Sequence, residues 1–196
     1  MKEEWGSLGI ERALITDRLK LRRFQESDIQ WFYDYRSDER VRRYQGSLSG
    51  YNRDQAADFV REQMRQTPGI PGFWQQVALE LTAEGRLIGD CGIHYLDSMP
   101  RQVELGITLV PEYQGRGYAR EALTAVLDIL LRELGVCRAV AFTDPRNERC
   151  MALLERLGMR RETYWAQHVQ VEGVWMDDWQ YAIWAEEWKN PPGGGD

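Results

Sequence analysis

The sequence of 196 residues predicts an α+β fold, in which a mixed, mostly antiparallel sheet surrounds one central strand–loop–helix unit. Three observations predict this fold. Segments with period-two alternation fill the middle and the end of the chain, two helix-like segments precede them, and a loop with two glycines opens the strongest apolar helical stripe. A chain of this length most economically forms one domain, which we expect over residues 1–189, with a disordered tail over 190–196.

The first third of the chain is predicted to contain one strand and two helices. The strand covers residues 18–24, with Leu19 and Leu21 on one face. Ser27 stands where a helix N-cap is expected, and the helix after it carries four large apolar or aromatic residues: Ile29, Trp31, Phe32 and Tyr35. A second helix is expected over residues 54–64 because three residues recur there along one stripe: Ala57, Val60 and Met64.

The middle of the chain is predicted to form three strands. Residues 77–81 and 87–96 flank the turn Ala83-Glu84-Gly85, a pattern that is typical of a hairpin. The next strand, residues 102–110, alternates most clearly. Its apolar face carries Val103, Leu105, Ile107 and Leu109, and its other face carries Gln102, Glu104, Gly106 and Thr108.

A crossover unit is predicted after this strand. An apolar helical stripe covers residues 119–134 and ends at Gly135, and a strand follows over residues 138–143. Because two strands joined through a helix in one sheet run in the same direction, we expect strands 102–110 and 138–143 to be parallel.

The last quarter is predicted to add one helix and a hairpin. Asn147 is expected to cap the helix, which ends at Gly158. Two strands, residues 159–169 and 174–185, are joined by the turn Glu172-Gly173. Five tryptophans are expected to pack this hairpin: Trp165, Trp175, Trp179, Trp184 and Trp188.

The loop at residues 114–119 is the most informative local feature. Gly115 and Gly117 join the end of a strand to the start of a helix, where backbone N–H groups are unpaired at the positive end of the helix dipole. Such a turn suits a phosphate or pyrophosphate. A Walker loop is excluded because no lysine follows Gly117, and a dinucleotide-binding fingerprint is excluded because Arg120 replaces its third glycine.

Composition narrows the class of protein further. The formal net charge of −6 argues against a nucleic-acid partner, and neither a membrane-length apolar run nor a signal peptide is evident. Cys91, Cys137 and Cys150 are odd in number and lack metal-ligand spacing. We therefore expect a cytoplasmic protein with reduced thiols and without a metal or a membrane partner. The oligomeric state stays open, a homodimer included.

Four segments carry a family resemblance. Residues 114–119 have the form Gln-x-x-Gly-x-Ala, which resembles the acyl-CoA pyrophosphate loop of the GNAT acetyltransferases. Residues 144–159 resemble that family's Asn-x-x-Ser…Leu-Glu-Lys-x-Gly-Phe helix, and residues 16–22 and 173–177 resemble its branch of ribosomal-protein N-terminal acetyltransferases. The resemblance covers nearly the whole chain and implies the GNAT fold, with acetyl-CoA as cosubstrate.

The resemblance also implies where acetyl-CoA binds. After Gln114, which opens the loop, the pyrophosphate is assigned to five backbone N–H groups, those of Gly115, Arg116, Gly117, Tyr118 and Ala119. Arg116 and Arg120 are expected to add charge-assisted bonds to the phosphates. The pantetheine arm is expected along the backbone of Ile107, Thr108 and Leu109, and Asn147 is expected to touch the cofactor as well as cap its helix.

Glu104 and Cys150 are the candidate catalytic residues. Glu104 lies on the polar face of the strand before the loop, beside Gly106, and an ammonium acceptor needs a base. An ordinary half-exposed strand glutamate is the alternative. Many family members carry a tyrosine acid where this chain has Leu154, but the ribosomal branch places a serine where Cys150 stands. Cys150 is therefore expected to protonate the leaving thiolate, with an acetyl-cysteine intermediate, a packing role or a water donor as alternatives.

The acceptor is the least defined part of the prediction. His94 and Asp177 are expected to line an acceptor cleft between the early helices and the last hairpin. For both His94 and His168, a structural role is favoured over a catalytic one. The branch resemblance implies transfer of an acetyl group to a protein N-terminal amine by direct attack. A small-molecule amine, such as an antibiotic, a polyamine or an amino-acid derivative, is the first alternative, and a non-catalytic acyl-CoA-binding module is the second.

Overall fold

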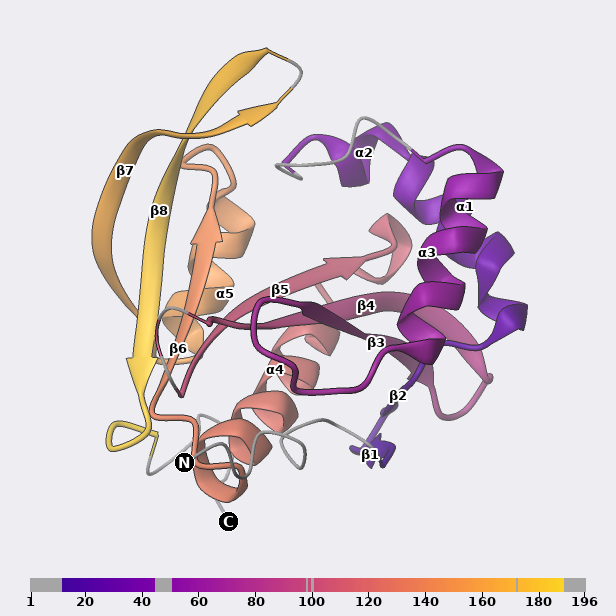
Figure 1. Cartoon of the computed structure of the whole chain (residues 1–196), viewed down its shortest axis with the longest axis horizontal. Helices are drawn as coiled ribbons and strands as arrows, with labels where there is room; N and C mark the ends of the chain where they lie inside the picture. Colours follow the sequence, from indigo (N-terminus) through magenta and orange to yellow (C-terminus); the bar gives the residue numbers. More distant parts are fainter. Residues whose placement is uncertain (1–11, 45–50, 98, 100, 172, 189–196) are drawn as a thin grey trace.

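A single eight-stranded sheet runs through the computed structural model, which describes residues 12–44, 51–97, 99, 101–171 and 173–188 (Figure 1). The strands lie in the order β1-β2-β3-β4-β5-β6-β8-β7. Their bounds are β1 Leu14–Ile15, β2 Leu19–Arg22, β3 Trp74–Leu81, β4 Arg86–Tyr95, β5 Gln102–Leu109, β6 Arg138–Thr143, β7 Arg160–Val171 and β8 Val174–Trp184. The predicted α+β fold is confirmed.

Helices cover both faces of the sheet. Their bounds are α1 Ile29–Ser37, α2 Glu39–Arg42, α3 Arg53–Arg65, α4 Tyr118–Asp128 and α5 Glu148–Arg156. Leu79 packs in one apolar cluster with α4 and α5, whereas its neighbour Ala78 packs in a second cluster with α1 and α3. Because successive strand residues point to opposite faces, α4 and α5 lie on one side of the sheet, and α1 and α3 lie on the other.

The central β5–α4–β6 unit has the predicted parallel geometry. Within the described part of the sheet, β5 and β6 are the parallel neighbours and the other neighbouring pairs are antiparallel. Their pairing begins at Gln102 opposite Arg138 and ends at Glu104 opposite Val140. Beyond Glu104 the two strands diverge, as Figure 1 shows, and a gap opens between their carboxyl-terminal halves.

Buried charge fixes α1 on the sheet. The guanidinium Nη2 of Arg36 lies 2.6 Å from Oδ2 of Asp90 on β4, and the hydroxyl of Tyr35 donates to Oδ1 of the same carboxylate at 2.5 Å. The side chains of Arg36 and Asp90 are only 7% and 1% exposed. Removing one partner from a buried pair of this kind typically costs about 3–5 kcal/mol. The pair therefore determines where α1 stands beside the cleft described below.

Several local predictions in the first third of the chain are wrong. Ser27 does not cap α1; it lies inside a short 3-10 helix, Glu26–Asp28, whose capping box is made by Gln25 and Asp28. Of the stripe predicted for α3, Val60 is buried, whereas Met64 is exposed and Ala56 is buried in place of Ala57. Trp31 is exposed, and α2 and β1 were not predicted.

The second half agrees more closely with the prediction. β6 has the expected bounds, whereas the helix predicted over residues 119–134 is α-helical to Asp128 and continues as a π-helical turn, Ile129–Glu133. Of the hairpin tryptophans, Trp188 is buried, but Trp165, Trp175 and Trp184 are exposed, so the hairpin is only partly packed by them. Glu172 of the predicted turn and the predicted tail, residues 190–196, lie outside the described residues. No helix among those described is both long and apolar enough to span a bilayer.

Candidate active site

The glycine loop adopts a left-handed backbone geometry that suits an anion site at a helix terminus. Gly115 and Gly117 have φ values of 72° and 85°, in the left-handed region that favours glycine, and α4 begins immediately after them at Tyr118. The first N–H groups of an α-helix have no acceptor within the helix. The loop therefore directs a cluster of donors and the positive end of the α4 dipole toward one point.

A distant arginine holds this loop in place. Nη1 of Arg18 donates to the carbonyl oxygen of Arg116 at 3.0 Å, and Nε donates to the carboxylate of Glu121 at 2.6 Å. The same guanidinium carbon lies 4.4 Å from the centre of the Tyr118 ring. Thr16 adds a hydrogen bond to Glu121 at 2.6 Å. These contacts fix the loop to the start of β2, and none of them was evident from the sequence.

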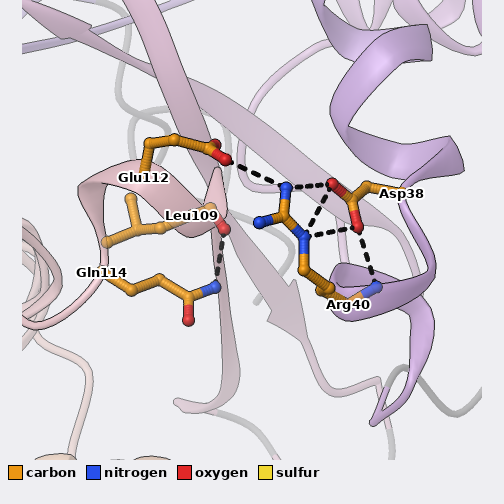
Figure 2. Close-up of polar contacts among 5 residues, drawn as sticks. All are labelled: Asp38, Arg40, Leu109, Glu112 and Gln114. Atoms are coloured by element: carbon orange, nitrogen blue, oxygen red, sulfur yellow. Dashed lines mark hydrogen bonds and ion pairs between the residues drawn. The ribbon is translucent and has the colours of Figure 1, made fainter.

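Side chains also fix the other end of the loop (Figure 2). Nε2 of Gln114 donates to the carbonyl oxygen of Leu109 at 3.0 Å, so Gln114 joins the loop to the last residue of β5. Nearby, Arg40 of α2 binds both Asp38 and Glu112, the latter at 2.9 Å. The Arg40–Glu112 pair is exposed and contributes little to stability. It does place α2 directly beside the approach to the loop.

A cleft of about 2270 Å³ connects the loop with the gap between β5 and β6. Single small-ligand sites usually occupy about 300–1,000 Å³, so this cleft has room for two reactants. Predicted cofactor residues that line it come from β5, the loop and the start of α5: Ile107, Thr108, Leu109, Gln114, Gly115, Gly117, Ala119, Arg120 and Asn147. Arg116 and Tyr118 border the loop outside this lining, held by Arg18.

Glu104 lies where β5 and β6 part. It pairs with Val140 in the last parallel register position, and its side chain lines the cleft with 25% exposure. Burial raises the pKa of Glu104 above its ordinary value, although His94 and His168 oppose that shift. Nδ1 of His94 is 3.5 Å from Oε2 of Glu104, too long for a strong hydrogen bond. The structure thus brings the predicted base and the predicted acceptor-site histidine together.

Trp74 forms part of the same wall and was missed from the sequence. Its ring stacks on His94 with centroids 5.0 Å apart, and it covers Gly92 and Gly106, which are cross-strand partners. A Cβ built on Gly92 would come within 2.9 Å of this ring, so a glycine is required there. The two glycines opposite each other were the only sequence signal for a ring in this position.

Cys150 lies in the first turn of α5, close to the gap. Oδ1 of Asn147 accepts a hydrogen bond from the Cys150 N–H at 3.2 Å, so Asn147 is the predicted helix cap. Burial raises the pKa of the Cys150 thiol, and a hydrogen bond with Thr143 partly offsets the rise. Leu154, at the position of the tyrosine acid in many relatives, is buried in the main core.

One predicted acceptor-site residue is not brought to the cleft. The Asp177 carboxylate accepts hydrogen bonds from the Tyr164 hydroxyl and, at 2.9 Å, from the Gln167 N–H, and it is not among the residues that line the cleft. Its neighbour Asp178 does line the cleft and binds His168. Asp178, one residue further along β8, thus lies where Asp177 was expected, because a shift by one residue moves a strand side chain to the opposite face.

The donors around the cleft suit an acyl-transfer site and show no metal centre. Within the described residues, no group of three or more His, Cys, Asp and Glu side chains is arranged to hold a metal ion. Instead, an anion-binding helix terminus, a gap between two strands, a carboxylate with a raised pKa and a thiol share one cleft. This combination is compatible with an acyltransferase that uses coenzyme A.

Comparison with known proteins identifies the family. The chain belongs to the GNAT acetyltransferases, since residues 18–160 match the model of the acetyltransferase (GNAT) domain. It is 30% identical to the uncharacterized N-acetyltransferase YnaD of Bacillus subtilis over 175 residues, which cover 89% of this chain and 98% of that protein. The protein is thus an acetyl-CoA-dependent N-acetyltransferase, as the sequence predicted.

Two further similarities are informative. The crystal structure of a GNAT acetyltransferase from Bacillus anthracis superposes with a TM-score of 0.79 at 28% identity, covering 90% of this chain and all of that one. The [ribosomal protein uS5]-alanine N-acetyltransferase of Escherichia coli is 33% identical over 84 residues, 43% of each chain. The first similarity supports the fold, and the second covers less than half of either chain.

The loop geometry predicts a selective effect of Gly115→Ala. Gly115 and Gly85 both have positive φ values, 72° and 63°, and a Cβ at either would meet nothing within 4 Å. Alanine at either position should therefore cost about 1–2 kcal/mol of folding free energy, measured by denaturant unfolding. Only Gly115→Ala should raise the Kd for acetyl-CoA in calorimetry. The rise should be roughly tenfold, because the loop would move to relieve the strain that alanine introduces at a positive φ. Equal Kd values for the two variants would contradict the assignment of the loop.

Proposed function

We propose that the protein transfers the acetyl group of acetyl-CoA to a protein N-terminal amine by direct attack. One observation carries this proposal. Glu104, a carboxylate that is largely removed from water, stands at the fork where β5 leaves β6, and that fork ends the gap leading from the glycine loop. A thioester that entered through this gap would have its carbonyl carbon beside the carboxylate.

Acetyl-CoA is proposed to bind along the loop and β5. The pyrophosphate accepts hydrogen bonds from the backbone N–H groups of residues 115–119, and Arg120 lines the cleft beside it. The pantetheine arm runs along residues 107–109, whose edge toward β6 lies beyond the last paired residue. Asn147 reaches the cofactor from the start of α5. Arg146 is not proposed to bind a phosphate, because its guanidinium Nη2 already lies 2.5 Å from Oδ2 of Asp144.

Glu104 is proposed as the general base. A general base works best when its pKa lies near the operating pH, and burial moves the pKa of Glu104 in that direction. The carboxylate must be ionised to accept a proton, so turnover should fall as the pH drops through the raised pKa of this group. His94, stacked on Trp74, lies on the side of Glu104 where the acceptor nitrogen would arrive.

Cys150 is proposed as the proton donor to the leaving thiolate. Its raised pKa keeps the thiol protonated at neutral pH, which suits an acid. The same shift disfavours a nucleophilic thiolate, so the attack on the thioester is assigned to the amine itself.

The acceptor is proposed to be a protein N-terminus of the ribosomal-protein type. The similarity to a uS5-alanine N-acetyltransferase supports this choice. The cleft is lined by Glu104 and Asp178, whose negative charge attracts an ammonium group. Its lining also includes residues of α1 to α3 and of the β7–β8 hairpin, which lie on opposite sides of the molecule in Figure 1. A ribosomal acceptor implies a cytoplasmic site of action, which is consistent with three free thiols.

The acceptor class can be tested by following thiol release from acetyl-CoA. N-terminal peptides beginning with alanine or serine, the same peptides with a blocked α-amine, and small amines including polyamines would be compared. We expect turnover with the free peptides and none with the blocked ones. Without acceptor, mass spectrometry should find Cys150 unmodified. Turnover with small amines alone would contradict the proposed acceptor, and an acetylated Cys150 that forwards its acetyl group would contradict direct attack.

Glu104→Gln should lower kcat by about 10²- to 10⁴-fold, the range for loss of a positioned base, while the Kd for acetyl-CoA changes little. The variant should also lose the acid limb of the pH–rate profile that Glu104 produces. Glu84→Gln is a matched control, because Glu84 is 51% exposed in a turn outside the cleft. An unchanged kcat in Glu104→Gln would remove this residue from the mechanism.

A further inference from the structure

An irregularity in the β7–β8 hairpin brings a hydrogen-bonded pair, His168 and Asp178, into the cleft. Trp165 of β7 stands opposite Asp178 of β8, but the next aligned pair is Val169 and Met176. Four steps along β7 thus match two steps along β8, so β7 carries a bulge with two extra residues. Gln167, inside the bulge, has a φ of 53°, a conformation that non-glycine residues rarely adopt.

The bulge has a visible consequence for one side chain. The backbone N–H of Gln167 donates a hydrogen bond to Asp177. The next residue, His168, is directed into the cleft, where its Nδ1 lies 2.9 Å from Oδ2 of Asp178. Bulges near active sites commonly redirect side chains in this way. Strain that the surrounding contacts maintain at such a position is a reason to look for a function.

His168 is held in one orientation. Its ring lies between Phe142 of β6, with centroids 4.8 Å apart, and Trp165, with centroids 5.5 Å apart. Since an ionised carboxylate only accepts hydrogen bonds, the Asp178 contact places the hydrogen of neutral His168 on Nδ1. Nε2 then keeps a free lone pair, and 34% of the side chain is exposed. His94, the other histidine of the chain, makes no comparable hydrogen bond to a carboxylate.

The charges around this pair are mainly negative. Glu104 on β5 interacts electrostatically with both His168 and Asp178, and Asp144 and Asp177 interact with Asp178. Arg146, which lines the same cleft, is bound to Asp144. This environment attracts an acceptor ammonium to the side of the cleft where His168 lies.

The chemistry of amide formation needs two proton removals from the acceptor. An ammonium must lose one proton before its nitrogen can attack, and the nitrogen must lose a second proton after it has bonded to the thioester carbon. One proton goes to the departing sulfur and the other goes to solvent. Glu104 lies on β5 at the fork, whereas His168 lines the cleft from the β7–β8 hairpin, so the two groups are suited to different protons.

We infer that His168 is a second catalytic residue, which takes the first proton from the acceptor ammonium, and that Asp178 is its positioning residue. In this step an N–H bond of the ammonium breaks, its electron pair stays on nitrogen, and the proton bonds to Nε2 of His168. The imidazolium, stabilised by Asp178, then releases the proton to water. Glu104 takes the second proton after attack, the C–S bond breaks, and Cys150 protonates the departing sulfur. The proton on Glu104 then returns through water to the Cys150 thiolate, so one proton ends on sulfur and one in solvent. The inference rests on the proposed amine acetylation and extends it.

The pH dependence of His168→Gln separates this role from a structural one. With a peptide acceptor at about pH 7, the variant should lose about 10²-fold in kcat/KM for the acceptor, with an unchanged Kd for acetyl-CoA. The deficit should shrink as the pH approaches about 9, because an α-amine with a pKa of about 8 is then already neutral. Asp178→Asn should show the same trend with a smaller deficit, because it leaves the ring in place without a defined tautomer.

Gln170→Ala is the control, because Gln170 lies on the same strand, is exposed and does not line the cleft. It should match the wild-type protein at every pH. A deficit in His168→Gln and Asp178→Asn that is constant with pH, or no deficit, would overturn the role of His168. Absence of turnover in the wild-type protein on every amine would instead overturn the proposed function, so the two failures are distinguishable.

Discussion

The backbone pairing between β5 and β6 ends at Glu104, and the rest of the site depends on the separation of the two strands beyond this residue. Two parallel strands that continued side by side would satisfy each other's backbone groups and leave no gap. Here the crossover through α4 sets the strands parallel, yet only Gln102 to Glu104 of β5 are paired with β6. The separation beyond Glu104 creates a polar strand edge, the glycine loop closes one end of it, and Cys150 borders it from α5.

Long-range ion pairs keep this open arrangement rigid. Arg18 and Glu121 fix the loop to the amino-terminal strand, and Arg36 and Asp90 fix α1 to β4. Both pairs join segments that are more than fifty residues apart in the chain. A site that holds two reactants in register needs supports of this kind, because a small displacement of either wall would separate the reacting atoms.

Sequence reasoning succeeded where the signal is local. Alternation in residues 102–110, the apolar stripe of α4 and the two glycines of the loop each depend on neighbours in the chain, and they were placed correctly. The failures depend on register or on distant partners. A bulge in β7 cannot be read from composition, so the sequence did not indicate that His168 and Asp178 line the cleft while Asp177 does not. Trp74 was missed because its partner His94 is on another strand.

Hydrogen exchange of the backbone amides, with and without acetyl-CoA, tests the central claim most directly. If the thioester arm occupies the gap between β5 and β6, residues 105–109 and the loop at 115–119 should gain protection together, while β3 stays unchanged. Protection of the loop without residues 105–109, or of neither, would contradict the claim that the divergence of these strands forms the acyl-binding site.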